Sequence, residues 1–138
     1  MIDYYETKSQ PITRKMVWEA YQEVRSKRGG SGVDGMTWNM LDKHAKGHLY
    51  KLWNRLSSGS YFPPPVLEVE IAKKDGGLRK LGIPTLLDRI AQQVVRKQLE
   101  IQLEPLFHGS SYGYRPNRSA HDAVAQSQRN CFNHDFAL

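Results

Sequence analysis

The sequence feature that most constrains the fold is a change in the spacing of apolar residues between positions 66 and 83. Apolar and polar residues alternate along two short runs here, whereas the segments on either side carry apolar residues three and four positions apart. Alternation is typical of a β-strand, and the wider spacing of an amphipathic helix. Asp75-Gly76-Gly77 lies between the two alternating runs and is a turn signal. The chain therefore has to combine helices with a β-hairpin from about Val66 to Ile83.

Four helices are expected around this hairpin, which gives an α+β architecture of helices packed on a β-hairpin or small antiparallel sheet. In chain order they are Pro11 to Arg28, Thr37 to about Leu56, Thr85 to Pro105, and a helix that starts at Ser119. The first should bury one face made of Val17, Ala20, Tyr21 and Val24. Thr85 with Asp88, and Ser119 with Asp122, are expected to cap the last two helices. One face of the last helix should carry Ala120, Ala123, Val124 and Ser127.

Two segments between these elements are predicted to be irregular. Four glycines make residues 29–36 a loop, and three consecutive prolines keep residues 61–65 extended. A third irregular segment, at residues 107–118, precedes the last helix.

Length and composition bound the class of protein. A chain of 138 residues with 39% hydrophobic and 25% charged residues is expected to form one folded domain or part of a larger one. We expect a polar tail at residues 1–10, a folded region at 11–138, no membrane span and a cytoplasmic location. The single cysteine, Cys131, excludes an internal disulfide framework, and the five scattered histidines give no zinc pattern.

A net charge of +6 indicates a polyanionic partner only weakly, so the position of the charge matters more. The predicted hairpin tip, residues 73–80, holds four cations and one carboxylate. If the strands pair symmetrically about Gly76, Lys73 opposes Arg79, and a polyphosphate between them would relieve their repulsion. A two-residue turn at Gly76-Gly77 would instead place them on opposite faces, and a merely solvated tip is the alternative.

Two further clusters have a composition that suits nucleic acid. Arg25, Lys27 and Arg28 lead into Gly29 and Gly30, whose backbone amides could contact phosphates; the alternative is an ordinary helix end.

The second cluster interleaves Tyr112 and Tyr114 with Arg115 and Arg118, which suits stacking and phosphate contact on a single strand. The alternative is that the tyrosines pack against helices and the arginines pair with acids such as Asp122.

The residues alone indicate no catalytic centre. The aspartates form no close carboxylate pair, and the histidines are too scattered for a claim about geometry; the aspartates in question are Asp34, Asp88, Asp122 and Asp135.

Long motifs in the chain resemble those of bacterial group II intron reverse transcriptases. Residues 32–35 and 61–66 are similar to the entry of the fingers in that family, residues 73–89 to its first core motif, and residues 111–123 to its second. The order and spacing match from about residue 12 onward. Positions 72, 74 and 80 depart from the pattern, because the family usually has proline where Ala72, Lys74 or Lys80 stands here.

The resemblance implies the fingers subdomain of a right-hand RNA-directed DNA polymerase that is also a maturase. It implies that Lys73 and Arg79 contact the triphosphate of the incoming dNTP, and that the glycine loop closes over the template. With the charge clusters, it suggests a set of RNA-contacting residues: Arg25, Lys27, Arg28, Gly29, Gly30, Lys74, Lys80, Tyr112, Tyr114, Arg115 and Arg118.

The resemblance also implies partners and a missing part. The partners would be group II intron RNA or another RNA template, a DNA primer and dNTP, in a cytoplasmic ribonucleoprotein. The family holds Mg²⁺ on palm aspartates, which Asp135 does not match, so the palm is expected to be absent. We therefore predict no catalytic residue, metal or other cofactor in this chain, and no polymerase activity by the chain alone. The alternatives are a stand-alone module that binds intron RNA without catalysis, and a self-associating piece.

Overall fold

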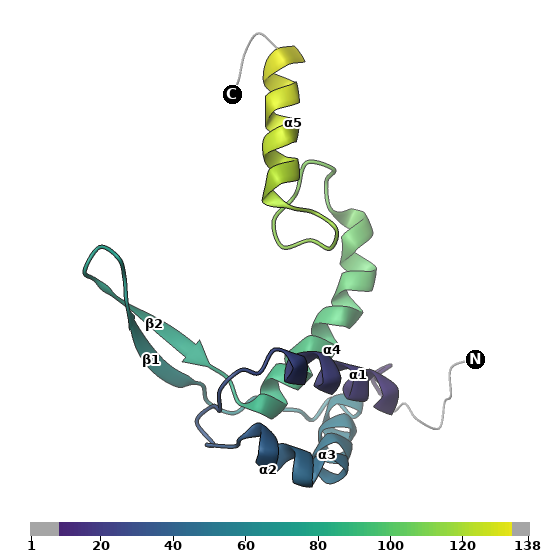
Figure 1. The fold of residues 1–138 in the computed structure, drawn as a ribbon. Coiled ribbons are helices and arrows are strands. Elements are labelled where there is room, and N and C mark those ends of the chain that lie inside the picture. The colour runs from purple at the N-terminus through teal and green to yellow at the C-terminus, as the bar shows by residue number, and fades with distance from the viewer. Residues whose placement is uncertain (1–8, 134–138) are drawn as a thin grey trace. The chain divides into compact units, whose positions relative to one another are not determined.

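The structure is a computed structural model and describes residues 9–133, in two units. Most of the tail expected at residues 1–10, and Asp135, lie outside the described residues. The first unit extends to Lys97 and the second begins at Gln98, so that α4 (Leu86–Leu103) begins in the first unit and runs into the second (Figure 1).

Helices build the buried core of the first unit, together with Ile12, which lies just before α1. They are α1 (Arg14–Ser26), α2 (Trp38–Lys43), α3 (Ala45–Ser57) and the start of α4. Thr13 caps α1 by accepting a hydrogen bond of 3.3 Å from the Met16 amide. The buried face predicted for α1 is confirmed, because Val17, Ala20, Tyr21 and Val24 are all buried. The other core residues are Ile12, Leu41, Leu49, Leu52, Trp53, Leu56, Leu86, Ile90, Ala91 and Val94.

The single helix predicted from Thr37 to Leu56 is wrong, because the chain breaks at His44. His44 has φ −127° and ψ 28°, outside the helical region, and it separates α2 from α3. Apolar residues that recur every four positions drift by about 40° per step around a straight helix. The break gives the two helices separate directions, and Leu41 and Leu49 are both buried.

The hairpin forms where it was predicted, but the helices do not cover it. Strands β1 (Leu67–Ala72) and β2 (Leu78–Ile83) make a two-stranded antiparallel sheet that projects from the helices of its unit (Figure 1). No strand residue is among the buried core of the described chain, and Leu67, Val69 and Leu81 are 37%, 36% and 44% exposed. The described residues thus combine helices with a small antiparallel sheet, which is compatible with the expected α+β architecture, while packing of helices on the sheet stays a prediction.

The first turn of α4 connects the hairpin to the core. Thr85 caps the helix as predicted, accepting a hydrogen bond of 3.2 Å from the Asp88 amide. The buried Asp88 carboxylate in turn accepts a hydrogen bond of 2.9 Å from the Tyr61 hydroxyl. Burial, and then the bond to Asp88, raise the pKa of Tyr61. Asp88 thus fixes the extended segment that leads into β1.

The second unit contains the end of α4, a 3-10 turn (Glu104–Leu106), an irregular loop and α5 (Ala120–Asn133). The predicted cap of α5 is confirmed, because Ser119 and Asp122 exchange hydrogen bonds. These bonds from Ser119 lower the pKa of Asp122. No described residue of this unit is buried, and Val124 and Phe132 on α5 are 66% and 82% exposed. The expected face of α5 that includes Val124 is therefore not covered by described residues.

Candidate nucleic-acid and triphosphate interface

The hairpin tip differs in register from the symmetric pairing predicted about Gly76. Arg79 pairs with Ile71, and Lys73 lies opposite Gly77, whose carbonyl accepts a hydrogen bond of 2.6 Å from the Lys73 amide. Residues 74–76 form a three-residue loop in which Gly76 has φ +84°, as such a loop requires of its last position. The strands therefore follow neither the pairing symmetric about Gly76, in which Lys73 would oppose Arg79, nor the two-residue turn at Gly76-Gly77.

The two cations nevertheless share one face of the hairpin. The Lys73 Cδ lies 3.6 Å from the place where a Cβ on Gly77 would stand, so the lysine stem covers Gly77. Arg79 is two residues further along β2, on the same face as Gly77. The two cations are thus diagonal neighbours, a spacing that side chains of this length can bridge through a shared anion.

The two faces of the hairpin carry opposite charge. Glu68 and Glu70 lie on the other face, where Lys80 pairs with Glu68 at 2.8 Å. No carboxylate within the described chain pairs with Lys73, Lys74 or Arg79. Lys73, Lys74 and Arg79 can therefore bind an anion from solution, whereas Lys80 is already paired with Glu68.

The basic end of α1 is partly occupied by a carboxylate. Arg25 makes a bidentate contact with Asp42, with its Nη2 2.8 Å from Oδ2, and the Tyr21 hydroxyl donates to the same carboxylate. The hydrogen bonds from Arg25, and then from Tyr21, lower the pKa of Asp42. All three basic residues are exposed, but Arg25 is bound to Asp42, whereas Lys27 and Arg28 form no ion pair with a carboxylate of the described chain.

The start of the glycine loop is held by the carbonyl groups of Gly29 and Gly30, which leaves the amides of these two residues available. The Gly29 carbonyl accepts from Trp38 Nε1 at 2.9 Å, and the Gly30 carbonyl accepts from Arg89 Nη2 at 2.6 Å. No backbone carbonyl between residues 9 and 133 accepts from the N–H of Gly29 or Gly30. A Cβ on Gly32 would stand 2.7 Å from backbone atoms of Thr85, so the loop packs directly on the start of α4.

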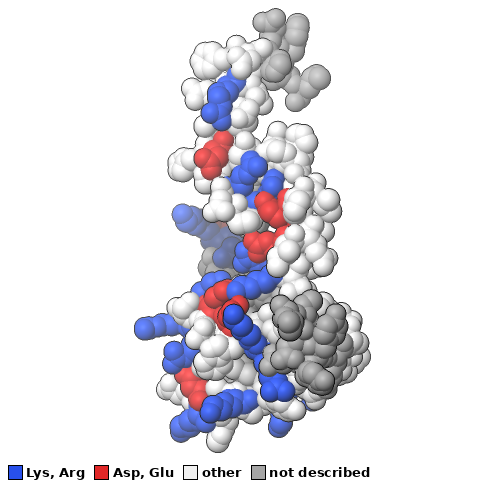
Figure 2. Space-filling model, turned by 90° about the vertical axis from the view of Figure 1, so that its right-hand side faces the viewer, with Lys and Arg blue, Asp and Glu red and all other residues white. Residues whose placement is uncertain are grey.

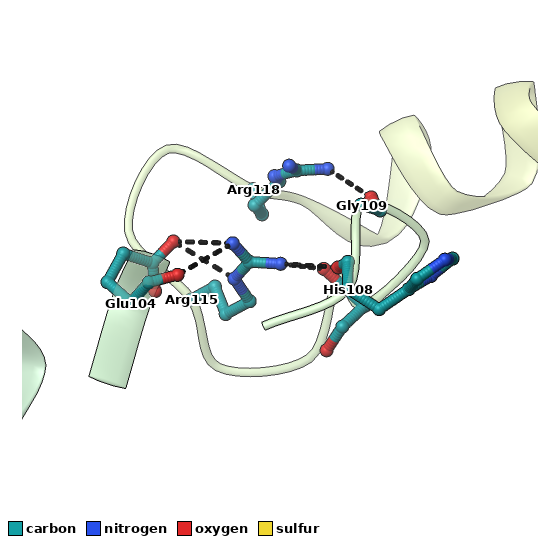
Figure 3. A network of polar contacts seen from close by, with 6 residues as sticks. Glu104, His108, Gly109, Arg115 and Arg118 are labelled. Carbon is teal, nitrogen blue, oxygen red and sulfur yellow. Dashed lines mark hydrogen bonds and ion pairs between the residues drawn. The ribbon is translucent and has the colours of Figure 1, made fainter. Parts of the chain in front are cut away.

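Arg115 in the second unit is engaged internally, in the network that Figure 3 shows. Its Nη2 lies 2.8 Å from a Glu104 carboxylate oxygen, and its Nη1 donates at 2.9 Å to the carbonyls of His108 and Ser111. Its side chain is only 9% exposed. The pairing of an arginine with an acid was anticipated, but the acid is Glu104 and not Asp122. Contact of Arg115 with RNA would require this network to open.

The remaining members of the Tyr/Arg cluster are more accessible. Arg118 donates to the Gly109 carbonyl at 2.8 Å (Figure 3). Its guanidinium also lies 5.1 Å from the centre of the Tyr112 ring. Tyr114 is fully exposed and has φ +56°, a strained conformation for a residue with a side chain. The tyrosines therefore do not pack into a helical core, and Tyr114 offers a free aromatic ring.

A basic stretch escaped the sequence analysis because its charges are spaced out. Residues 43–67 contain no Asp or Glu, yet they include four Lys or Arg residues and two histidines, most of them on α3. The face drawn in Figure 2 shows basic side chains scattered, several with acidic ones beside them. A count of carboxylates along the chain would have identified this stretch.

The described residues provide no metal centre, and no helix among them is long and apolar enough to cross a bilayer. They do not fit the Mg²⁺ ion expected for an intact polymerase, so we derive no step through that ion.

Comparison with known proteins identifies the class. No family model matches the sequence. Group II intron-encoded protein LtrA of Lactococcus lactis is 39% identical over 111 residues, which is 80% of this chain and 18% of that protein. Protein YkfC of Escherichia coli is 43% identical over 108 residues, 77% of this chain and 28% of that protein. An uncharacterized 91 kDa protein in the cob intron of Schizosaccharomyces pombe is 32% identical over 120 residues, 82% of this chain and 14% of that protein.

The chain is therefore a relative of intron-encoded proteins. More narrowly, it belongs with the group II intron-encoded proteins, which confirms the resemblance in the sequence motifs. It spans less than a third of the length of each of these three relatives.

Proposed function

We propose that this chain is the fingers region of a group II intron reverse transcriptase and maturase, an RNA-directed DNA polymerase. In this proposal the hairpin tip contacts the triphosphate of the incoming dNTP, and the glycine loop and the Tyr112–Arg118 segment contact the RNA template. The relationship to group II intron-encoded proteins supports the class. The observation that carries the proposal is that Lys73 and Arg79 share one face of the hairpin and neither forms an ion pair with a carboxylate of the described chain. The nearby Asp75 carboxylate accepts a hydrogen bond of 3.3 Å from the Gly77 amide.

The chemistry of these two side chains suits a triphosphate. Lysine contributes a compact point charge, and arginine contributes a planar fork that can bond two phosphate oxygens at once. Phosphoryl transfer depends on positioning and on neutralising charge, and the two cations would do both at the phosphates. The Mg²⁺ of an intact enzyme would be held by residues other than those described, so the chain alone is expected to bind and not to polymerise.

Titration of the 138-residue chain with inorganic tripolyphosphate tests the triphosphate site. Replacing Arg79 with Gln should raise the Kd about tenfold or more, because a charge-assisted hydrogen bond contributes about 1.5–3 kcal/mol. Lys80→Gln is the matched control, since Lys80 is the next residue on the same strand but pairs with Glu68 on the other face. Equal effects of the two substitutions would mean that the tip attracts anions without a defined site.

The polymerase assignment requires the intact enzyme to which this region is proposed to belong. There, Arg79→Ala should raise the KM for dNTP by roughly ten- to a hundredfold, for the same missing bond. An unchanged KM and turnover would refute the role of Arg79 even if the isolated chain binds tripolyphosphate.

The second candidate function is a module that binds intron RNA without catalysis. The acid-free stretch at residues 43–67 and the available amides of Gly29 and Gly30 favour it. Binding of a single-stranded RNA should weaken with salt, log K falling by about 0.7 per phosphate contact for each decade. No binding at low salt would eliminate this candidate.

A further inference from the structure

A second surface of the first unit combines cations with aromatic rings. A groove of about 450 Å³ lies between α1 and α3, and no hairpin residue lines it. Its lining includes three cations, three aromatic residues and no acid: Arg14, Lys15, Lys46, Trp18, Tyr50 and Trp53. A cavity of this size falls in the range that small-molecule ligands occupy.

The aromatic rings of the groove are accessible to a ligand. Trp18 on α1 is 46% exposed and Tyr50 on α3 is 54% exposed, although both lie beside a buried core. Tyr50 also packs against Trp53, with 5.5 Å between ring centres, which holds its ring in place. Each of the two helices therefore places one exposed aromatic ring in the groove, Trp18 from α1 and Tyr50 from α3.

The cations of the groove are arranged to contact an anion. The Arg14 guanidinium lies 4.6 Å from the centre of the Trp53 ring and 5.7 Å from that of Tyr50. Stacking on a ring leaves the N–H groups at the edge of a guanidinium available for hydrogen bonds to phosphate. Lys15 has only a 4.0 Å contact with Glu19 at the surface, a pair of little strength.

Single-stranded nucleic acid is the ligand that can use both the exposed aromatic rings and the cations of the groove. Its bases stack on aromatic rings whatever their sequence, and its phosphates bind Lys and Arg beside those rings. A duplex keeps its bases stacked on one another, so it could use only the cations. An acidic peptide could likewise use the cations but has no regular series of flat rings.

We propose that the groove between α1 and α3 binds unpaired RNA, with a base stacked on Tyr50 or Trp18 and the adjoining phosphates on Arg14, Lys15 and Lys46. This site is separate from the hairpin tip and does not depend on the triphosphate contact proposed there. Its α3 residues belong to the acid-free stretch at residues 43–67, so it rests on the second candidate function, RNA binding, and gives that function a defined site. The first unit would then bind RNA even when no dNTP is bound at the hairpin tip.

Binding of a fluorescein-labelled twelve-residue oligoadenylate RNA to the 138-residue chain tests the stacking. Tyr50→Leu should weaken the affinity about fivefold or more, the reduction expected when one base no longer stacks. Phe132→Leu removes an aromatic ring that is 82% exposed on α5 and should leave the affinity unchanged. Thermal melting by circular dichroism verifies that both variants are folded. Equal affinity of the folded Tyr50→Leu variant and the unchanged chain would overturn the proposal.

The charge contacts have a separate readout. The double substitution Lys15→Gln and Lys46→Gln should lower the salt dependence of log K by about 0.7 for each phosphate that the RNA no longer places on a lysine. Arg129→Gln on α5 is the control and should leave the slope unchanged. A slope that stays the same in the double variant would count against the phosphate contacts of the groove.

Tryptophan emission and a competitor identify the ligand class. Stacking should quench tryptophan emission, and Trp18→Phe should remove part of that quenching. Displacement of the RNA by polyglutamate at equal charge concentration would indicate an acidic-protein surface and overturn the assignment to RNA.

Discussion

The hairpin tip and the Tyr112–Arg118 segment have similar basic compositions and use their charge in opposite ways. In the segment, Arg115 donates to Glu104 and to two backbone carbonyls, and its side chain is only 9% exposed. At the tip, Lys73 and Arg79 have no carboxylate partner among the described residues. The comparison teaches that a cation predicts a binding site only after its internal partners are known.

The largest expected effect is on the internally bonded loop. Arg115→Ala leaves the partly exposed Glu104 carboxylate and two carbonyls without their donor, which should destabilise the loop by about 2–3 kcal/mol. Hydrogen exchange of residues 104–119 measures this change locally. Arg129→Ala, which removes only a hydrogen bond to Gln126, should leave exchange in the loop unchanged. Unaltered exchange in Arg115→Ala would show that the network does not hold the loop.

A somewhat smaller effect is expected at the glycine loop. An alanine at Gly32 would bring its Cβ within 2.7 Å of Thr85 backbone atoms, so Gly32→Ala should lower the free energy of unfolding by about 2 kcal/mol. Gly30→Ala is the matched control because a Cβ there meets nothing within 4 Å. Urea denaturation measures both, and equal stability of the two variants would contradict the close packing of loop and helix.

Acid should weaken the ion pairs that carboxylates of the first unit form with arginine and lysine, whereas the hairpin tip has no such pair to lose. Hydrogen bonds from Arg25 hold the pKa of Asp42 below its usual range, and hydrogen bonding to Lys97 similarly lowers the pKa of Glu23. A carboxylate with a lowered folded-state pKa contributes stability above its unfolded pKa, and this is lost as pH falls through the folded value. The melting temperature should therefore decrease as the pH is lowered past about 4. Asp42→Asn should flatten that decline, and an unchanged profile would contradict the assignment.

The smallest effect on stability is expected at the hairpin tip. Because neither Lys73 nor Arg79 has a carboxylate partner within the described chain, Arg79→Gln should change the free energy of unfolding by no more than about 0.5 kcal/mol. Urea denaturation beside the tripolyphosphate titration separates binding from stability. A destabilisation comparable to that of Arg115→Ala would remove the contrast between the two regions.

The sequence predicted those parts of the fold that depend only on residues close together in the chain. The buried face of α1 and the caps at Thr85 and Ser119 were predicted because each depends on residues within two helical turns. The break at His44 was missed because no glycine or proline marks it. The hairpin register was missed because Gly76 and Gly77 can each occupy the last position of a three-residue loop.

One part of the candidate site, the hairpin tip, was also predictable because it depends on residues close together in the chain. Lys73 and Arg79 do share a face, because alternation along a strand is a local property. The partners of Arg115 and Arg89 could not be read from spacing, since Glu104 lies eleven residues away and Gly30 fifty-nine. Roles that depend on such distant contacts need the folded chain.

The contact between Arg89 and Gly30 has a consequence for the order of folding. The hairpin closes over a three-residue loop, and Trp38 bonds the Gly29 carbonyl from only nine residues away, whereas the Gly30 carbonyl gains its donor only when Arg89 reaches it across fifty-nine residues. Contacts of long sequence separation form slowly, because the entropy of closing the loop is given up before the contact stabilises it. During synthesis the hairpin can therefore form first, and the glycine loop takes its final shape only after the first turn of α4 has left the ribosome.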